Sequence, residues 1–215
     1  MAMAKINGTY KTQTTTALLV GSYVDAYFEG TLEELKKEYY SAIYTKQNTL
    51  RADFKKAEEI IARVEKDPLF MKFMSGEKQK IFTAEMFGVP WKIKIDSYHE
   101  GICIVDLKVV RNLKTLPIWR YDIQGAVYQE VTYLNTGKRL PFYLAPVTKE
   151  DVIDLDIFQI MQEDLDFALA EVEVNISRYA AIKAGEIEPH SCGECDYCKS
   201  VKSARIRNYN ELREG

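Results

Sequence analysis

The spacing of hydrophobic residues changes near residue 78, from a helical repeat to an alternating one. Before this point they recur every three or four positions, which is typical of amphipathic helices. After it they alternate with polar residues, which is typical of strands. The predicted elements are helices over residues 17–30, 32–44, 54–66 and 68–74, then strands over 78–88, 91–98 and 102–109. Short connections between the strands favour an antiparallel arrangement of all three.

The second half of the chain returns to the helical repeat, with a strand-like segment in between. The predicted elements are a helix over residues 118–137, strands over 138–148 and 152–160, and a long helix over 161–183. Pro141 and Pro146 indicate that the first of these strands lies at a sheet edge or is irregular, because proline has no N–H to donate. We therefore expect a mixed α/β (α+β) fold, in which helices flank a mixed central sheet.

The C-terminal segment differs in composition from the rest, so we expect a core over residues 1–184 and a cysteine-containing tail over residues 185–215. The tail carries the pattern C-x-x-C-x-x-C, formed by Cys192, Cys195 and Cys198. Thiolates at this spacing can converge on one metal centre, either Zn²⁺ or an iron–sulfur cluster. His190 could complete a zinc site, and the alternative is a loop of reduced thiols. Cys103 is expected to be a small buried hydrophobic residue of the sheet.

The composition is that of an ordinary globular protein, with 47% hydrophobic and 28% charged residues. The net charge of −3 neither supports nor excludes nucleic-acid binding, because a local basic groove is enough to hold phosphates. No apolar run reaches the roughly 18 residues that suggest a membrane helix. The N-terminus also lacks the apolar core of a signal peptide. We expect a soluble cytoplasmic protein with reduced cysteines.

Asp96, Asp106 and Lys108 stand on the otherwise apolar strands of the predicted hairpin over residues 91–108. A period of two places Asp106 and Lys108 on the same face. Removing a carboxylate and an ammonium group from water is unfavourable unless both have partners. The trio suits phosphodiester hydrolysis, in which the carboxylates bind Mg²⁺ or Mn²⁺ and Lys108 orients the attacking water. The alternative from these residues alone is a solvated strand face.

The order of the predicted elements and three motifs together resemble the PD-(D/E)xK nuclease superfamily, whose restriction-endonuclease-like core is written αβββαβ. The motifs are Lys94-Ile95-Asp96, Ile104-Val105-Asp106-Leu107-Lys108 and the Q-x-x-x-Y segment over residues 121–128. More closely, the chain is similar to phage-type exonucleases of the RecE (exodeoxyribonuclease VIII) and RecB-like group over most of its length. Ile95 replaces the usual proline of this group. The resemblance implies that Asp96 and Asp106 bind metal and that Lys108 acts on the water.

Further metal ligands follow from the same resemblance. The backbone carbonyl of Leu107 is one, since its side chain points away from the site. Asp25 is another, because it stands where the group has a histidine, and an oxygen ligand can replace nitrogen on a hard cation. Gly21, Asp25 and Glu29 fall four residues apart on one helix face. Glu85 on the first strand could serve a second metal ion. The alternative for Asp25 and Glu85 is solvated surface.

The resemblance also implies contacts to DNA. Gln124 and Tyr128 lie four residues apart on a helix expected beside the hairpin, and they would contact the substrate strand through hydrogen bonds and stacking. Arg120 could lie along the same edge. The alternative is an amphipathic helix that carries an ordinary tyrosine.

These features predict a Mg²⁺-dependent deoxyribonuclease, namely an exonuclease that acts on double-stranded DNA ends in phage-type recombination. Two alternatives remain: a structure- or site-specific endonuclease on the same core, and a non-catalytic module that binds metal or DNA. The resemblance implies a single-strand-annealing recombinase as partner and a ring-like homo-oligomer.

Some RecB-type nucleases join C-terminal cysteines to an upstream cysteine. Here no cysteine precedes Cys103, and the start at MAMAKINGTY indicates that an upstream segment is absent.

Overall fold

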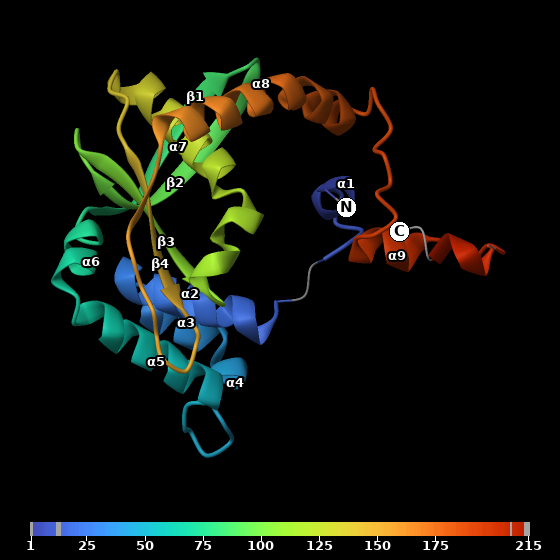
Figure 1. Ribbon diagram of the computed structural model, residues 1–215. Helices are drawn as coiled ribbons and strands as arrows, with labels where there is room; N and C mark the ends of the chain where they lie inside the picture. The colour runs from blue at the N-terminus through green and yellow to red at the C-terminus, as the bar shows by residue number, and fades with distance from the viewer. Residues whose placement is uncertain (1, 12–13, 207, 213–215) are drawn as a thin grey trace. The chain divides into compact units, whose positions relative to one another are not determined.

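The computed structural model describes residues 2–11, 14–206 and 208–212 (Figure 1). Two compact units are present. One is Thr14–Ser177, and the other combines the described residues of Met1–Gln13 and Arg178–Gly215. The division falls inside the last long helix, between Ser177 and Arg178. Among the described residues, no helix combines the length and the apolar character needed to cross a membrane.

Helix α2 (Thr16–Glu29) opens the larger unit and has the ends that the sequence predicts. The Thr15 hydroxyl accepts a hydrogen bond from the Leu18 amide (3.2 Å), which caps the first turn. Gly30 ends the helix in the left-handed region at φ 83°, a conformation that favours glycine. The buried face of α2, which includes Tyr23, packs against α5. Position 25 of α2 is thereby fixed relative to the sheet.

The remaining helices before the sheet are α3 (Leu32–Glu38), α4 (Tyr40–Ile43), α5 (Ala52–Glu65) and α6 (Pro68–Phe73). The single helix predicted over residues 32–44 is divided at Tyr39, whose φ of −108° and ψ of 28° are not helical. Helices α2 and α5 and one face of the sheet enclose the first hydrophobic core (Figure 1).

The described residues form a five-stranded mixed sheet in the order β1-β2-β3-β4-β5. Its strands are β1 (Glu77–Met86), β2 (Val89–His99), β3 (Cys103–Val110), β4 (Phe142–Thr148) and β5 (Phe158–Ile160). Strands β1, β2 and β3 are antiparallel, as the sequence predicts, and β4 runs parallel to β3. The fold is therefore the expected mixed sheet flanked by helices.

Strand β4 lies inside the sheet, so of the two possibilities that its prolines raised, an edge position or an irregular strand, the edge position is wrong. It pairs with β3 along its whole length, and Pro146 stands opposite Lys108. On its other side β5 pairs only with the first part of β4, from Phe142 to Leu144. Pro146 lies beyond that ladder, where its missing N–H interrupts no regular pairing with β5.

Helices α7 (Tyr121–Thr136) and α8 (Gln162–Ala184) follow the 3₁₀ helix η1 (Leu113–Trp119). Helix α7 and the first part of α8 cover the other face of the sheet and enclose the second hydrophobic core. Close packing of α7 on β4 depends on Gly125, because a Cβ there would lie 2.7 Å from Cδ1 of Phe142. In the second core, α7 therefore packs closely on β4, the strand next to β3.

The smaller unit contains α1 (Ala2–Ile6), α9 (Asp196–Val201) and the 3₁₀ helix η2 (Tyr209–Leu212). Within it, the rings of Tyr10 and Tyr197 meet edge to face with centroids 5.5 Å apart. This contact joins the N-terminal segment to α9, the helix that begins after Cys195 and contains Cys198.

Candidate active site

Asp106 and Lys108 lie on the same face of β3, as the alternating pattern predicts. Nζ of Lys108 forms an ion pair with Oδ2 of Asp106. The Asp106 side chain is only 2% exposed, so this pair is largely removed from water. Because each group is the other's counter-charge, the ion pair offsets part of the free-energy cost of removing both charges from water.

Asp96 reaches this pair from β2 through a break in the strand ladder. The described β2–β3 pairs end at Ser97 opposite Val105. One residue further along, Oδ2 of Asp96 accepts a hydrogen bond from the Leu107 N–H (3.0 Å). Gln79, the residue of β1 at the level of Asp96, has φ 54°, and its pair is missing from the β1–β2 ladder. The irregular backbone here turns the Asp96 carboxylate toward β3, as bulges beside functional sites do.

Asp25 lies on α2, whose buried residues belong to the first hydrophobic core, and it approaches the same place. Asp25, Asp96 and Leu107 line a small cavity of about 10 Å³, roughly the space for one water molecule. Oδ1 of Asp25 is buried and has no hydrogen-bond partner among the described residues. A buried carboxylate oxygen without a partner is unfavourable, so the geometry leaves one ligand position open toward the cavity.

Glu29 also lines this cavity, one helical turn after Asp25. Its Oε1 accepts a hydrogen bond from the Gln79 amide and lies 3.7 Å from Nζ of Lys94. We did not predict Glu29 as a site residue. The four-residue spacing of Gly21, Asp25 and Glu29 on one helix face was the signal that could have identified it.

The electrostatics of the cluster are dominated by carboxylates that burial keeps from ionising easily. Burial and the neighbouring negative charges raise the pKa of Asp25 to about 8 and that of Asp96 to about 7. Burial also raises the pKa of Asp106, although the Lys108 ammonium opposes this. For Lys108, burial lowers the pKa, but the Asp106 carboxylate outweighs it and raises the pKa above its usual value. The cluster therefore needs more positive charge than Lys108 supplies.

A divalent cation fits this requirement. Mg²⁺ and Mn²⁺ prefer oxygen ligands, and the cluster offers carboxylates from α2, β2 and β3. Elsewhere in the described chain, the closest set of three ligand atoms is sulfur, within 4.8 Å of one another. The carboxylates of Asp25, Asp96 and Asp106 are not among the described groups whose ligand atoms lie that close together. The Leu107 carbonyl stays a predicted ligand beside them.

Helix α7 contacts the cluster through Gln124 and Tyr121. Nε2 of Gln124 donates a hydrogen bond to Oδ1 of Asp106 (2.7 Å), and Nζ of Lys108 lies 4.9 Å from the centre of the Tyr121 ring. Tyr128 packs edge to face against Phe142 and is half-buried, and burial raises its pKa. Gln124 thus reaches a predicted metal ligand directly, and contacts of Gln124 and Tyr128 with DNA stay predictions.

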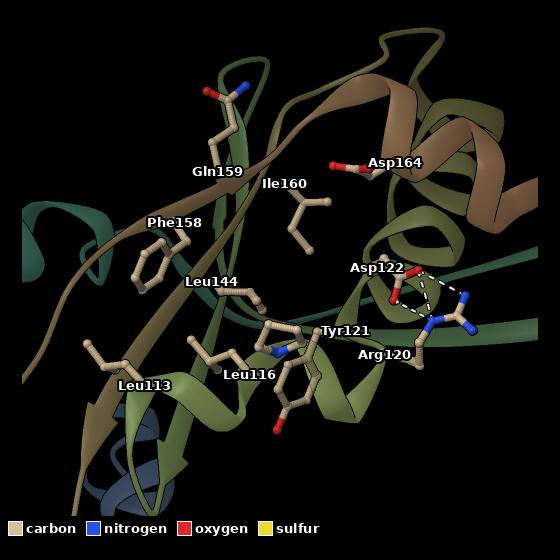
Figure 2. Close-up of a pocket in the computed structure, with 11 residues that line it drawn as sticks. Leu113, Leu116, Arg120, Tyr121, Asp122, Leu144, Phe158, Gln159, Ile160 and Asp164 are labelled. Carbon is tan, nitrogen blue, oxygen red and sulfur yellow. Dashed lines mark hydrogen bonds and ion pairs between the residues drawn. The ribbon is translucent and has the colours of Figure 1, made fainter.

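The structure does not bring Glu85 or Arg120 into the cluster. Glu85 is exposed and stands opposite Pro90, near the tip of the β1–β2 hairpin and far along β1 from Gln79. The Arg120 guanidinium is ion-paired with Asp122 (3.0 Å, Figure 2) and with Glu171 (2.7 Å). Arg120 would have to exchange these partners before it could bind a phosphate.

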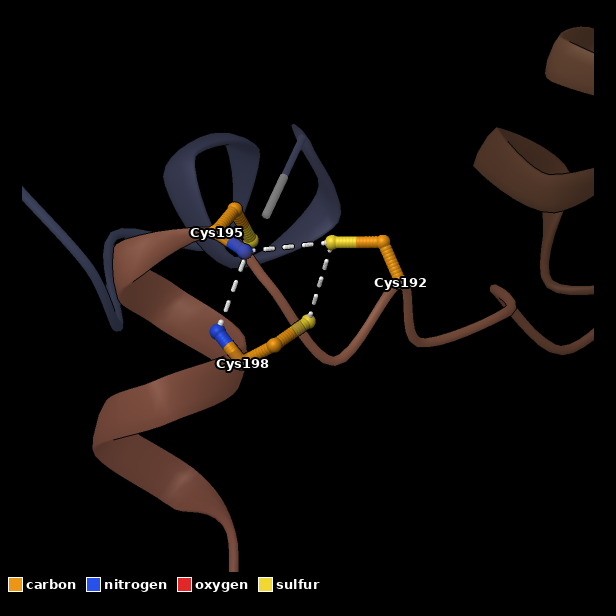
Figure 3. A group of neighbouring side chains, drawn as sticks. All are labelled: Cys192, Cys195 and Cys198. Atoms are coloured by element: carbon orange, nitrogen blue, oxygen red, sulfur yellow. Dashed lines mark hydrogen bonds between the residues drawn. The ribbon is translucent and has the colours of Figure 1, made fainter. Parts of the chain in front are cut away.

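In the smaller unit, Sγ atoms of Cys192, Cys195 and Cys198 all lie within 4.8 Å of one another (Figure 3). A hydrogen bond from the Ser191 hydroxyl (3.1 Å) is the main cause that lowers the pKa of Cys198 to about 6. Hydrogen bonds from backbone amides lower the pKa of Cys192 as well. Thiolates are the form that binds metal. His190 is not part of this group of ligand atoms, whereas Cys103 is buried in the sheet as expected.

The fold and the Asp96/Asp106/Lys108 cluster define a protein of the PD-(D/E)xK nuclease superfamily. The chain belongs to the family described as a PDDEXK-like domain of unknown function (DUF3799), whose model matches residues 1–201. It is similar to the crystal structure of a candidate exonuclease from Eubacterium rectale, with 46% identity and a TM-score of 0.93. The match covers 99% of this chain and 85% of that one.

A second solved structure, SSO0001, is 16% identical and covers 96% of this chain and 94% of that one. Its TM-score of 0.37 is too low to support any argument. No curated protein matches the chain.

Proposed function

We propose that this protein is a metal-dependent deoxyribonuclease that hydrolyses phosphodiester bonds at the cluster of Asp25, Asp96, Asp106 and Lys108. The observation that carries the proposal is the gathering of one buried carboxylate, Asp106, and two partly buried ones, Asp25 and Asp96, near the Lys108 ammonium group. The raised pKa values of Asp25 and Asp96 indicate that the cluster lacks positive charge. Mg²⁺ or Mn²⁺ is the cation whose preferred ligands match these side chains.

The chain's own residues would hold the cation and keep its ligands in place. Asp25, Asp96 and Asp106 offer the carboxylate oxygens. The Leu107 N–H fixes Asp96, and the Gln124 amide fixes Asp106. When bound, the cation supplies an acidified water molecule and stabilises negative charge on the phosphate.

Lys108 would act on the reacting groups themselves. Its Nζ is held between the Asp106 carboxylate and the Tyr121 ring. From there it can donate a hydrogen bond to the attacking water or to a phosphate oxygen, and its positive charge offsets the charge that develops in the transition state. Its raised pKa keeps it protonated at neutral pH.

Support for an exonuclease comes from the similar Eubacterium rectale protein, which is described as a candidate exonuclease. We extend this activity to the present chain, with double-stranded DNA ends as substrate. The rival function is a structure- or site-specific endonuclease on the same core, and a second rival is a non-catalytic metal- or DNA-binding module.

The deciding experiment compares an end-labelled linear duplex with a covalently closed circle, each incubated with Mg²⁺, with Mn²⁺ and with EDTA. We expect metal-dependent release of label and an intact circle. Asp106→Asn and Lys108→Ala should each lower the rate by about 100-fold or more. Glu85→Gln, which changes an exposed carboxylate outside the cluster, serves as the matched control. Efficient cutting of the circle would favour the endonuclease, and activity that survives both substitutions would overturn the site.

The proposal includes further points, of which the family resemblance supports the recombinase partner and the homo-oligomer. The protein would work in the cytoplasm in phage-type recombination, beside a single-strand-annealing recombinase and as a homo-oligomer. The thiols of Cys192, Cys195 and Cys198 would hold Zn²⁺ or an iron–sulfur cluster. Co-purification with a recombinase encoded nearby and light scattering of the isolated protein test the first two points.

A further inference from the structure

A pocket of about 510 Å³ opens on the sheet face that carries Asp106, on the side of β4 and β5 (Figure 2). Its walls are mainly apolar and aromatic: they include Leu113, Leu116, Tyr121, Leu144, Phe158 and Ile160. A concave, mostly apolar space with a few polar groups is the usual form of a small-molecule or nucleotide subsite. Neither the proposed metal ligands nor Lys108 belong to its lining.

The pocket adjoins the cluster through the sheet register. Asp106 stands directly opposite Leu144 on β4, and Leu144 stands opposite Phe158 on β5. Residues directly opposite one another share a sheet face, so all three side chains project to the same side. With a strand spacing of about 4.8 Å, the Phe158 backbone lies roughly 10 Å from that of Asp106. That separation is short enough for one nucleotide to span.

Tyr121 closes the gap between the two places. It lines the pocket, and its ring also lies 4.9 Å from Nζ of Lys108. A nucleotide whose phosphate lay at Lys108 would therefore have its base directed along the Tyr121 ring toward Phe158.

The charges of the lining favour an uncharged, planar occupant. Arg120 lines the pocket, but Asp122 and Glu171 already neutralise its guanidinium. Asp164 adds negative charge to the lining, which disfavours a phosphate group. Phe158 and Tyr121 offer aromatic faces, and stacking on such faces accommodates any base.

We propose that this pocket receives the unstacked base of the nucleotide beside the scissile phosphate, and that Phe158 is a stacking residue. The inference rests on the proposed function, since it places the phosphate at Lys108. Holding the base outside the duplex stack positions the end of one strand at the carboxylates. Stacking on an aromatic side chain accepts any base. The pocket would therefore recognise an unpaired end, and it would not distinguish one base from another.

The test uses duplexes whose terminal nucleotide at the cleaved end is either normal or an abasic tetrahydrofuran analogue, which keeps the phosphate and removes the base. For the wild-type protein with Mg²⁺, we expect kcat/KM to fall by about tenfold or more on the abasic end, in line with the usual value of one stacked base. Phe158→Ala should lower kcat/KM on the normal end by a similar factor and leave the abasic end unchanged.

Phe167→Ala is the matched control, because Phe167 is 74% exposed on α8 and does not line the pocket. It should leave both substrates unaffected. Phe158 is itself 39% exposed, so its truncation should not prevent folding, and thermal unfolding checks this. Phe158→Tyr, which keeps an aromatic face, should retain discrimination between the two ends.

A binding measurement separates this inference from the proposed function. In EDTA, fluorescence anisotropy of the same duplexes labelled at the far end should show weaker binding of the abasic end to the wild-type protein. Phe158→Ala should bind both equally. Equal rates and equal affinities of the wild-type protein for the two ends would overturn the pocket assignment while leaving the nuclease intact. Absence of hydrolysis on every substrate, with discrimination in binding retained, would overturn the nuclease proposal alone.

Discussion

The Gln124 side-chain amide donates a hydrogen bond over 2.7 Å to Asp106, so helix α7 is tied to a proposed metal ligand on β3. The bond fixes the orientation of a carboxylate whose other side-chain partner among the described residues is Lys108. Hydrogen bonds of this kind around metal ligands commonly govern affinity for the metal.

Substitution of Gln124 by alanine should therefore weaken metal binding and hydrolysis while leaving the fold intact. We expect a loss of about 10- to 100-fold in the apparent affinity for Mg²⁺ or in kcat. The measurement is a Mg²⁺ titration of the rate. Gln47→Ala, which removes an exposed amide in a distant turn, is the control. An unchanged Mg²⁺ requirement in Gln124→Ala would mean that the amide serves the substrate instead.

Asp25→Asn should make the metal-free protein more stable. The same substitution should abolish hydrolysis when metal is present. An unfolded aspartate has a pKa of about 3.9, whereas the pKa of folded Asp25 is about 8. Between these values the folded state retains a proton that the unfolded state has lost. The free energy of unfolding therefore falls as pH rises from about 4 to about 8.

Asparagine cannot ionise, so this part of the pH dependence should disappear in the variant. In EDTA at pH 8 we expect Asp25→Asn to exceed the wild-type protein by about 1–3 kcal/mol in urea unfolding. Mg²⁺ should raise the Tm of the wild-type protein more than that of the variant. A variant that is less stable than the wild-type protein at pH 8 would contradict the claim that the ionised Asp25 side chain is destabilised by burial without a partner.

Gly125→Ala should destabilise the protein, although alanine usually stabilises a helix. The added Cβ would lie 2.7 Å from Phe142 and 3.0 Å from Leu165, so α7 must move away from β4. We expect a net loss of about 1–2 kcal/mol in the free energy of unfolding, and a lower rate because Gln124 moves with the helix. Gly21→Ala on α2 is the control, since its Cβ would meet only Val109 at 4.0 Å. That variant should be neutral or up to about 1 kcal/mol more stable.

Serine substitution of any one cysteine in the 192/195/198 group should release bound metal. Each Sγ belongs to one cluster within 4.8 Å, and three ligands cannot lose one without a large loss of affinity. Elemental analysis for zinc and iron, with visible absorption for an iron–sulfur centre, measures the content. Cys103→Ala, which changes a buried thiol of the sheet, should leave it unchanged. Absence of both metals from the anaerobically purified wild-type protein would indicate free thiols.

The features that the sequence predicts well are those set by local spacing. Alternation along β3 is enough to place Asp106 and Lys108 on one face, and the helical repeat over residues 17–30 is enough to place α2 within one residue of its bounds. A similar order of motifs then identified the fold, because the order of helices and strands restricts the possible topologies.

The features that could not be predicted depend on contacts between distant segments. Arg120 looked free for DNA, but its partner Glu171 is far away in the sequence. Pro146 suggested an edge strand, because strand order across the sheet is not encoded in the strand itself. Glu85 was predicted as a ligand of a second metal ion but lies far along β1 from the cluster, whereas Glu29, for which no role was predicted, lines the cavity. Only the folded hairpin shows that the cluster lies at the end of β1 where Gln79 stands.

The hydrogen bond from the Leu107 N–H to Asp96 makes a backbone amide a natural spectroscopic probe of the cluster. The chemical shift of an amide proton depends on the charge of the oxygen that accepts it. One resonance in a two-dimensional NMR spectrum should therefore move as Asp96 loses its proton and move again as a cation takes up its charge. The protein thus carries an unmodified reporter at the point where its strands separate, readable without substrate or turnover.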